Sequence, residues 1–441
     1  MSSDAQPQRR RREAVARRMR ERGGGVLLLP AAGERIRNAD SEYIFRPDSD
    51  HLYLTGFEEP DGCALLFAGE GTGPTRLVLF VRPRDKEKEI WNGYRAGVEG
   101  AMERFGADEA HPVAELEGRL PALLDGAGPL WYRFGQDDAW DARLARAIRD
   151  LRARSRTGAR APEEILDPAA ALHEERLLKG PEEVALLRRA AEITAEAHLA
   201  AMRDGHAGRR EHQVQAEIEY AFRRRGGNGP GYGTIVAAGA NSCILHYRAG
   251  DAELRDGDVC LVDAGGEYRW YTADVTRTFP VSGTFTAAQR TLYEVVLGAQ
   301  EEAIAAVRPG ATVDGIHELA VRRLTEGMIR LGLLEGNAEE RIADKSFRRY
   351  YMHRTSHWLG LDVHDVGDYY PGKVSRPLAP GMVITVEPGL YVAADDAQAP
   401  AEMRGVGIRV EDDILVTADG GDNLTRAIPK RPEEVEAACA R

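Results

Sequence analysis

Two aspartates lie eleven positions apart on either side of a turn signal, in a stretch whose flanks the sequence predicts to be extended. Asp263 closes the apolar run 259–262, which is typical of a buried strand, and Gly265–Gly266 marks the turn. Asp274 belongs to the second extended run, which continues to residue 281. Two adjacent strands joined by a tight turn can bring both carboxylates to one site. A buried carboxylate there needs a cation, a hydrogen bond, a proton or a metal ion.

This pair alone does not identify a metal site. Aspartates beside glycine-rich turns commonly cap the turn or pair with an arginine, and Arg277 lies close by in the sequence. The stretch by itself therefore favours a cap or an ion pair, and a metal site needs further ligands.

Further acids and histidines follow about a hundred residues later in the sequence. Glu387 ends the apolar run 382–386, and Glu411 lies within another predicted strand, 406–416. Glutamate is uncommon in a buried strand unless a positive charge meets it. The segment 353–364, which lies between the aspartate strands and these glutamates, holds three of the eleven histidines of the chain, namely His353, His357 and His364. Each is weak evidence alone, because a lone histidine is more often a hydrogen-bonding residue than a metal ligand.

Together, the four carboxylates and at least one imidazole form a hard, oxygen-rich set of possible ligands. Such a set suits Mn²⁺, Co²⁺, Fe²⁺ or Zn²⁺ in a two-metal site better than it suits a thiolate zinc site. Two ions about 3.5–4 Å apart can share a bridging hydroxide near neutral pH, because metals lower the pKa of bound water. The chemistry that the set predicts is hydrolysis.

The surroundings of these residues resemble those in the metal-dependent peptidases of the pita-bread fold. Asp263, Asp274, His357, Glu387 and Glu411 match the five metal ligands of that family in order and in local sequence. Longer motifs look like its Xaa-Pro aminopeptidase (aminopeptidase P) branch, and the likeness covers essentially the whole chain. These motifs are Ile244-Leu-His-Tyr247, Ser356-His-Trp-Leu-Gly-Leu-Asp-Val-His-Asp-Val-Gly367, Val386-Glu-Pro-Gly-Leu-Tyr391, Gly407-Ile-Arg-Val-Glu-Asp-Asp413 and Phe45-Arg-Pro-Asp-Ser-Asp-His-Leu-Tyr-Leu-Thr-Gly-Phe-Glu-Glu-Pro-Asp61.

The resemblance implies a centre of two divalent ions, for which we expect Mn²⁺, with Co²⁺ or Zn²⁺ as alternatives. Asp263, Asp274 and Glu411 would bridge the ions, and His357 would bind one of them. Glu387 would lie beside the bridging hydroxide as the general base.

The resemblance also implies roles for residues that are not metal ligands. His246 and His364 match catalytic pocket histidines that hold the substrate and stabilise the developing oxyanion. His353 matches a further substrate-binding histidine, and Tyr391 and Arg409 match residues that bind substrate or orient the acids. Position 354 departs from the family, because it is arginine where glycine is usual. Because of this departure, the sequence does not predict the preferred size of the substrate.

The implied function is that of a metal-dependent aminopeptidase that hydrolyses the N-terminal Xaa-Pro bond of peptides. A prolidase, which cleaves Xaa-Pro dipeptides with the same fold and metals, is the nearest alternative. The segment Glu89-Ile-Trp-Asn-Gly-Tyr-Arg-Ala-Gly97 favours aminopeptidase P. Creatinase and metal-free binding proteins of this fold lack the complete acidic set, which this chain retains.

The elements that would position these residues fall into two predicted domains, since 441 residues exceed the size of a typical single core. Residues 1–175 read as an α/β domain that we expect to control substrate access or oligomerisation. It contains no Gly-x-Gly-x-x-Gly after a strand, so nucleotide binding is not indicated. Its predicted strands are 26–29, 53–57, 63–67 and 77–81, and its predicted helices are 98–105, 113–124 and 139–154.

Residues 176–441 are predicted to form the catalytic pita-bread domain of α+β type. Two helices followed by strands occur twice, which indicates two similar halves about a pseudo-twofold axis. Each half could then deliver acids to a shared centre. The predicted helices are 181–204, 213–225, 286–307 and 313–331.

Composition narrows the possible partners and compartments. A net charge of −12 argues against general nucleic-acid binding. The chain has neither a signal-peptide core nor an apolar run of the roughly 18 residues that span a bilayer, so we expect a cytoplasmic protein with no membrane partner. The four cysteines are scattered, as in a reducing compartment. The resemblance further implies a homo-oligomer, either a dimer or a tetramer.

Overall fold

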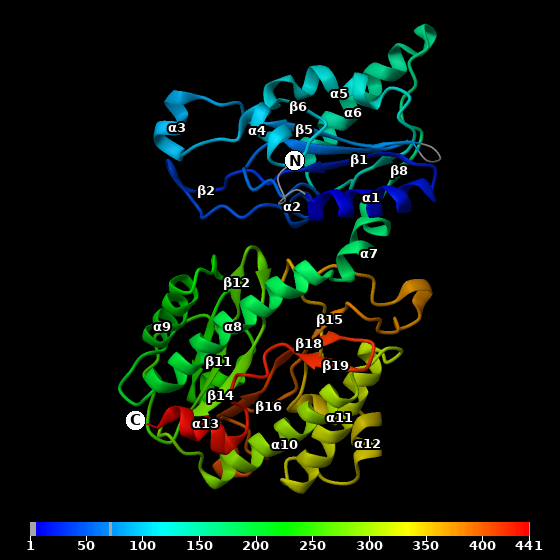
Figure 1. Ribbon diagram of the computed structural model, residues 1–441. Coiled ribbons are helices and arrows are strands. Elements are labelled where there is room, and N and C mark those ends of the chain that lie inside the picture. The colour runs from blue at the N-terminus through cyan, green and yellow to red at the C-terminus, as the bar shows by residue number, and fades with distance from the viewer. Residues whose placement is uncertain (1–5, 70–72, 441) are drawn as a thin grey trace. The chain divides into compact units, whose positions relative to one another are not determined.

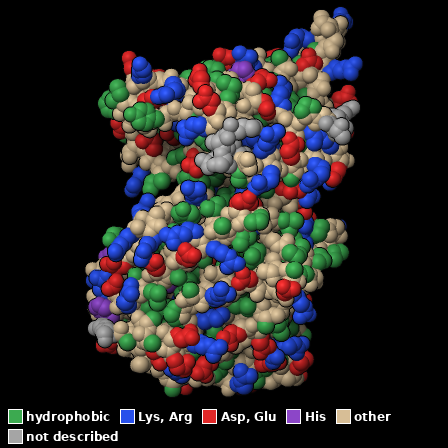
Figure 2. Space-filling model, in the orientation of Figure 1, with side chains coloured by type: hydrophobic (Ala, Val, Ile, Leu, Met, Phe, Trp, Pro, Cys, Tyr) green, Lys and Arg blue, Asp and Glu red, His purple; other side chains and the backbone are tan. Residues whose placement is uncertain are grey.

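The computed structural model describes residues 6–69 and 73–440, and the chain forms two compact units, Met1–Arg176 and Leu177–Arg441 (Figure 1). None of the helices in these described ranges is long and apolar enough to cross a membrane. Acidic and basic side chains are interspersed over the face of each unit seen in Figure 2.

The first unit is built on a six-stranded sheet of mixed direction, in the order β6-β5-β4-β1-β7-β8. Strand β4 runs antiparallel to both β1 and β5, whereas the remaining neighbours are parallel. The strands are β1 (Gly25–Pro30), β4 (Cys63–Ala68), β5 (Thr75–Val81), β6 (Glu109–Pro112), β7 (Leu130–Trp131) and β8 (Ile165–Leu166), with a separate hairpin of β2 (Ile36–Asn38) and β3 (Ser41–Glu42).

Helices cover both faces of this sheet. Helices α5 (Leu116–Leu124) and α6 (Asp138–Ala153) bury leucines and Trp140 against one face, where Val26, Leu65 and Val78 lie in the same apolar cluster. Helices α1 (Gln6–Arg20) and α2 (Ser49–Thr55) lie on the opposite side in Figure 1. The remaining helices of the unit are α3 (Lys86–Asn92), α4 (Gly97–Glu103) and α7 (Leu172–Leu177), the last of which runs into the second unit.

The strand predicted at 53–57 is wrong, because most of this segment belongs to helix α2. The Asp48 side chain caps the helix by accepting the backbone N–H of His51 at 2.8 Å. Gly56 ends the helix with φ of 66°, a left-handed conformation that glycine adopts readily. The aromatic and β-branched residues suggested a strand, but the caps on both sides determine the local structure.

In the second unit, helices surround short sheets that carry the predicted ligands. The helices are α8 (Pro181–Asp204), α9 (Glu211–Arg224), α10 (Ala287–Ala305), α11 (Val313–Arg330), α12 (Ala338–Ala343) and α13 (Pro432–Cys439). Helix α8 begins as predicted at Pro181, where the Glu183 carboxylate accepts the backbone N–H of Gly180 at 2.9 Å. Residues Ile193, Phe222, Val262, Tyr293 and Ile408 share one large apolar cluster, which joins both halves of the unit.

Each half of the second unit contributes a pair of helices and then strands, as the sequence predicted. In the first half, α8 and α9 precede a sheet of β10 (Ile235–Ala238), β11 (Val259–Asp263) and β14 (Thr276–Pro280). In the second half, α10 and α11 precede a sheet of β15 (Val383–Val386), β18 (Asp412–Val416) and β19 (Gly421–Asn423), and a pair of β16 (Gly389–Val392) and β17 (Val406–Arg409).

Two connections differ from the prediction. The link between the aspartate strands is not a single tight turn, because β12 (Gly266–Tyr268) and β13 (Tyr271–Thr272) form a hairpin within it, and β12 also pairs with β9 (Gly229–Pro230). The predicted strand 406–416 is broken into β17 and β18, and Glu411 lies in the break. There its backbone N–H donates to the Thr276 carbonyl at 3.1 Å, so the break joins the two halves.

Candidate metal centre

The acids from both halves converge on one imidazole. Asp263 ends β11, Asp274 lies two residues before β14, and Glu411 lies between β17 and β18. One ligand atom from each of Asp274, His357 and Glu411 lies within 4.8 Å of the others. The Nε2 atom of His357 is 3.3 Å from Asp274 Oδ2 and 3.6 Å from the Oε1 atom of Glu387, which follows β15.

The orientation of His357 suits a ligand. Its Nδ1–H donates to the Trp358 carbonyl at 3.0 Å, which leaves Nε2 facing the carboxylates. Its backbone N–H donates to Thr385 Oγ1 at 3.1 Å, and the Thr385 N–H donates to the His357 carbonyl at 3.0 Å. Strand β15 therefore fixes the backbone of His357 through Thr385. Glu387 is the residue that directly follows this strand.

Arg409 lies behind the acids and neutralises one of them. Its guanidinium is 2.7 Å from Asp263 Oδ2 and also donates to Thr276 Oγ1 at 2.9 Å and to the Tyr391 hydroxyl at 3.0 Å. Thr276 in turn donates to Glu411 Oε2 at 2.7 Å. This network fixes Asp263 and Glu411 in orientation through a single buried arginine.

Arg277, the arginine considered as an alternative partner for the aspartates, has a different role. It is fully buried and pairs with Asp412 at 2.7 Å. It also donates to the backbone carbonyl of Glu411 at 2.6 Å. Arg277 therefore supports the chain on which Glu411 lies.

The electrostatics of the cluster favour a bound cation. Burial, aided by the neighbouring acids, raises the pKa of Asp263 and Glu411 and raises that of Glu387 to about 7. Burial alone would lower the pKa of His357, but the hydrogen bond and charge of Asp274 and the charge of Glu387 raise it to about 9. Four carboxylates face one guanidinium, two of them buried (Asp274 and Glu411) and two half-buried (Asp263 and Glu387), so the protein alone leaves excess negative charge.

The residues present therefore fit divalent metal ions. The donor set consists of carboxylate oxygens and one imidazole nitrogen, which suits Mn²⁺ and similar ions. In the absence of a metal, protons bind to the carboxylates whose pKa is raised. A metal cation that replaced these protons would relieve the repulsion between the carboxylates.

A cavity of about 680 Å³ opens over this cluster and is lined by nine of the ten predicted site residues. Tyr391 is the exception: it is buried, and its hydroxyl lies 2.8 Å from His353 Nε2. The other nine are Asp263, Asp274, Glu387, Glu411, His246, His353, His357, His364 and Arg409.

The three histidines outside the ligand set approach the cluster from different sides. His364 is exposed, and its ring meets that of His357 edge-on with centroids 4.4 Å apart. His246 is exposed on the wall of the cavity. His353 Nδ1 lies 3.6 Å from Glu387 Oε2, and burial together with the charge of Arg409 lowers the pKa of His353 to about 3. His353 is therefore a neutral imidazole beside Glu387.

Three supporting residues were not predicted from the sequence. The Tyr232 hydroxyl donates to Asp263 Oδ1 at 2.7 Å, Asp413 Oδ2 accepts the backbone N–H of Asp274 at 3.1 Å, and Thr276 links Arg409 to Glu411. Asp413 and Thr276 each lie two residues from a predicted ligand, and this spacing on extended chain was the one available signal. Tyr232 carried no such signal, since it reaches Asp263 from the glycine-rich loop before β10.

Two protein-family descriptions match the chain. The N-terminal domain of aminopeptidase P matches residues 8–131, and metallopeptidase family M24 matches residues 185–418. The Xaa-Pro aminopeptidase of Escherichia coli K12 is 46% identical over 428 residues, covering 97% of this chain and 96% of that protein. Human Xaa-Pro aminopeptidase 3 is 34% identical over 406 residues, covering 91% of this chain and 78% of that protein.

Solved structures match to a similar extent. Aminopeptidase PepP of Pseudomonas aeruginosa is 45% identical with a TM-score of 0.95, covering 98% of this chain and 97% of that one. An Escherichia coli aminopeptidase P in complex with substrate is 44% identical with a TM-score of 0.95, covering 100% of this chain and 99% of that one.

Proposed function

The chain belongs to metallopeptidase family M24, and we propose that it is an aminopeptidase that releases the first residue of peptides with proline in second position. The resemblance predicted from the sequence, the pita-bread catalytic domain with its aminopeptidase P-like N-terminal domain, and the assignment as a metallopeptidase are confirmed by the matches. The proposed requirement for proline in second position rests on the names of the relatives. No residue type in the cavity indicates it.

We propose that two divalent ions are held by Asp263, Asp274, His357, Glu387 and Glu411. The observation that carries this proposal is the convergence of Asp274, His357 and Glu411 within 4.8 Å from segments far apart in sequence. Metal ions at such a site supply hydrolytic chemistry, because they lower the pKa of water and polarise a carbonyl. Mn²⁺ is the proposed metal, with Co²⁺ or Zn²⁺ as alternatives, because the donor set is rich in carboxylate oxygens.

Glu387 is proposed as the general base. Its carboxylate lies within the cluster, 3.6 Å from His357 Nε2, and lines the cavity, where it would take a proton from the attacking water. The adjacent His353 is neutral and keeps its Nε2 on Tyr391, so it does not compete for that proton. His246 and His364, exposed in the cavity, would donate N–H groups to the substrate carbonyl as negative charge develops.

The general-base assignment is tested by Glu387→Ala. We expect kcat on an Xaa-Pro-Yaa tripeptide to fall about 10²–10⁴-fold. Exposed Glu402 lies outside the cavity, so Glu402→Ala removes the same charge and serves as the control. Undiminished turnover by Glu387→Ala would rule out the assigned role.

A prolidase is the second candidate function, because it shares the fold and the metals. Full-length relatives named Xaa-Pro aminopeptidase favour the aminopeptidase. Rates on an Xaa-Pro dipeptide and on an Xaa-Pro-Yaa tripeptide would separate the two, and cleavage of the dipeptide alone would favour the prolidase.

A further inference from the structure

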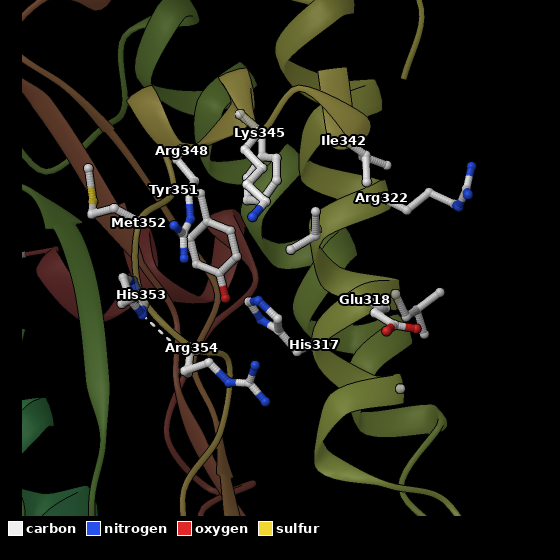
Figure 3. A pocket seen from close by; sticks show the side chains of 14 residues that line it. His317, Glu318, Arg322, Ile342, Lys345, Arg348, Tyr351, Met352, His353 and Arg354 are labelled. Atoms are coloured by element: carbon white, nitrogen blue, oxygen red, sulfur yellow. Dashed lines mark hydrogen bonds between the residues drawn. The ribbon is translucent and has the colours of Figure 1, made fainter. Parts of the chain in front are cut away.

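A second cavity, of about 690 Å³, is shown in Figure 3. It shares two lining residues, His353 and Arg354, with the cavity over the metal centre. One wall is the face of α11 that carries His317 and Arg322, and the facing wall is the segment 342–354. Both cavities lie within the second unit. The two cavities therefore meet at His353 and Arg354.

The wall between the cavities is held by buried hydroxyl groups. The hydroxyl of fully buried Tyr351 lies 2.6 Å from Thr355 Oγ1, which lies 2.8 Å from His317 Nδ1. Thr355 is two residues before His357, and its carbonyl accepts the backbone N–H of Glu387 at 2.8 Å. The shape of the second cavity is thus connected to the backbone of the metal centre.

Two of the arginines that line the second cavity are already paired. Arg322 lies 2.9 Å from Glu339. Arg354 pairs with Asp314, whose carboxylate also accepts the Tyr370 hydroxyl at 2.9 Å. This ion pair holds Arg354 at the junction of the cavities, where the sequence departs from the family's usual glycine.

Two further cations line the same cavity and lack such neutralisation. Lys345 and Arg348 are exposed, and neither forms an ion pair with another residue in the described ranges. Lys345 also has a left-handed backbone, with φ of 62°, which is uncommon for a residue with a side chain. Both cations therefore remain available to an anion entering from solvent.

We propose that this cavity receives the part of a peptide substrate that follows the proline, and that Lys345 and Arg348 bind a carboxylate there. This inference rests on the proposed function, because an aminopeptidase removes one residue and the rest of its substrate must extend out of the catalytic cavity. The carboxylate could belong to an aspartate or glutamate side chain or to the C-terminus, since both offer the same charge-assisted hydrogen bonds. The favoured substrates are thus peptides with proline in second position that present a carboxylate to this cavity.

The test compares kcat/KM for matched peptides that begin Ala-Pro and carry glutamate, glutamine or lysine at successive later positions. Each peptide is made with a free or an amidated C-terminus, which separates a terminal from a side-chain carboxylate. We expect the best-placed glutamate to exceed lysine by about two- to fivefold, as exposed charge pairs produce. The preference should appear in KM, because the contact is remote from the bond cleaved, and should weaken as salt is raised.

The double variant Lys345→Gln/Arg348→Gln should abolish this preference and leave kcat on the neutral glutamine peptide unchanged. Arg330 and Lys373 are exposed cations outside both cavities, so Arg330→Gln/Lys373→Gln removes the same charge and should retain the preference. Cleavage of the neutral peptide without any charge preference, or a preference that survives in the first double variant, would overturn the inference alone. Failure to cleave any Ala-Pro peptide would overturn the proposed function as well.

Discussion

At the scale of single residues, Arg409 is the cation on which the acid cluster depends. It is buried, and it touches Asp263, Thr276 and Tyr391 at once. Arg409→Met should destabilise the metal-free protein by about 3–5 kcal/mol, because it leaves Asp263 buried without its cation. Arg409→Lys retains a charge without the planar fork and should recover part of this loss.

Urea unfolding of the metal-free variants measures the effect of Arg409. Arg330→Met, which changes an exposed arginine on the last turn of α11, provides the matched control and should stay within about 0.5 kcal/mol of the parent. Wild-type stability in Arg409→Met would show that Asp263 does not need this partner.

The metal-free protein should lose stability as pH rises from about 7.5 to 9. Folding raises the pKa of Glu387 from its ordinary value of 4.5 to about 7 and that of His357 from 6.5 to about 9. The folded state therefore holds protons in this window that the unfolded chain releases, and stability falls as they leave. The histidines whose pKa is lowered by burial, namely His51, His198, His317, His353 and His364, are neutral in both states above about pH 7.5, well past their ordinary value of 6.5.

Thermal unfolding across this pH range, with and without Mn²⁺, tests the predicted dependence of stability on pH. Bound metal replaces the protons, so we expect the decline to disappear when Mn²⁺ is present. An equally steep decline with metal present, or a flat curve without it, would contradict the proposed electrostatics of the cluster.

Residue types in the sequence were enough to predict much of the candidate site, but not the contacts between the ligands and the residues that support them. The ligands could be proposed because carboxylates after apolar runs are unusual and their local motifs were distinctive. Tyr232 and Arg409 reach Asp263 from segments far from it in sequence, so residue types alone could not assign these contacts. The roles of the ten site residues stay predictions until variants are measured.

At the scale of elements, a buried ion pair ties the start of the second unit to the loop after His364. Lys179, just before α8, lies 2.9 Å from Asp365, and both side chains are 1% exposed. The Lys179 backbone N–H also donates to the Gly381 carbonyl at 2.8 Å, before β15. This pair therefore positions the segment that presents His364 to the cavity.

Lys179→Met should reduce stability by about 3–5 kcal/mol, because it removes the cation beside a buried carboxylate. If the pair positions His364, kcat should fall together with stability under conditions where the variant remains folded. Arg323 pairs with Glu302 on the surface, so Arg323→Met is the control and should leave stability close to that of the parent. Normal kcat in folded Lys179→Met would show that the pair has a structural role only.

Long periodic elements could be predicted, whereas short ones and breaks could not. Helices α8, α10 and α11 lie close to their predicted bounds, since apolar periodicity and terminal caps agree. The segment 53–57 was predicted wrongly because residue preference and capping disagree there, and capping prevails. The break at Glu411 has no local signal, since it depends on the hydrogen bond to Thr276 from the other half.

At the scale of the whole molecule, the sequence already indicated two parts, and two family descriptions match them separately. Length and repeated patterning sufficed for this organisation. The identity of the metal, the homo-oligomer, the role of the N-terminal domain and the cytoplasmic location stay predictions. They depend on binding equilibria, on surfaces between chains and on the cell, which patterns within one chain do not encode.

The central claim is that acids from both halves hold two divalent ions with His357, and calorimetric titration of metal-stripped protein with Mn²⁺ tests it most directly. We expect two ions per chain in the wild type, and loss of at least one of them in Asp274→Ala. Absence of Mn²⁺ binding by the wild type, or wild-type stoichiometry and affinity in Asp274→Ala, would contradict the claim.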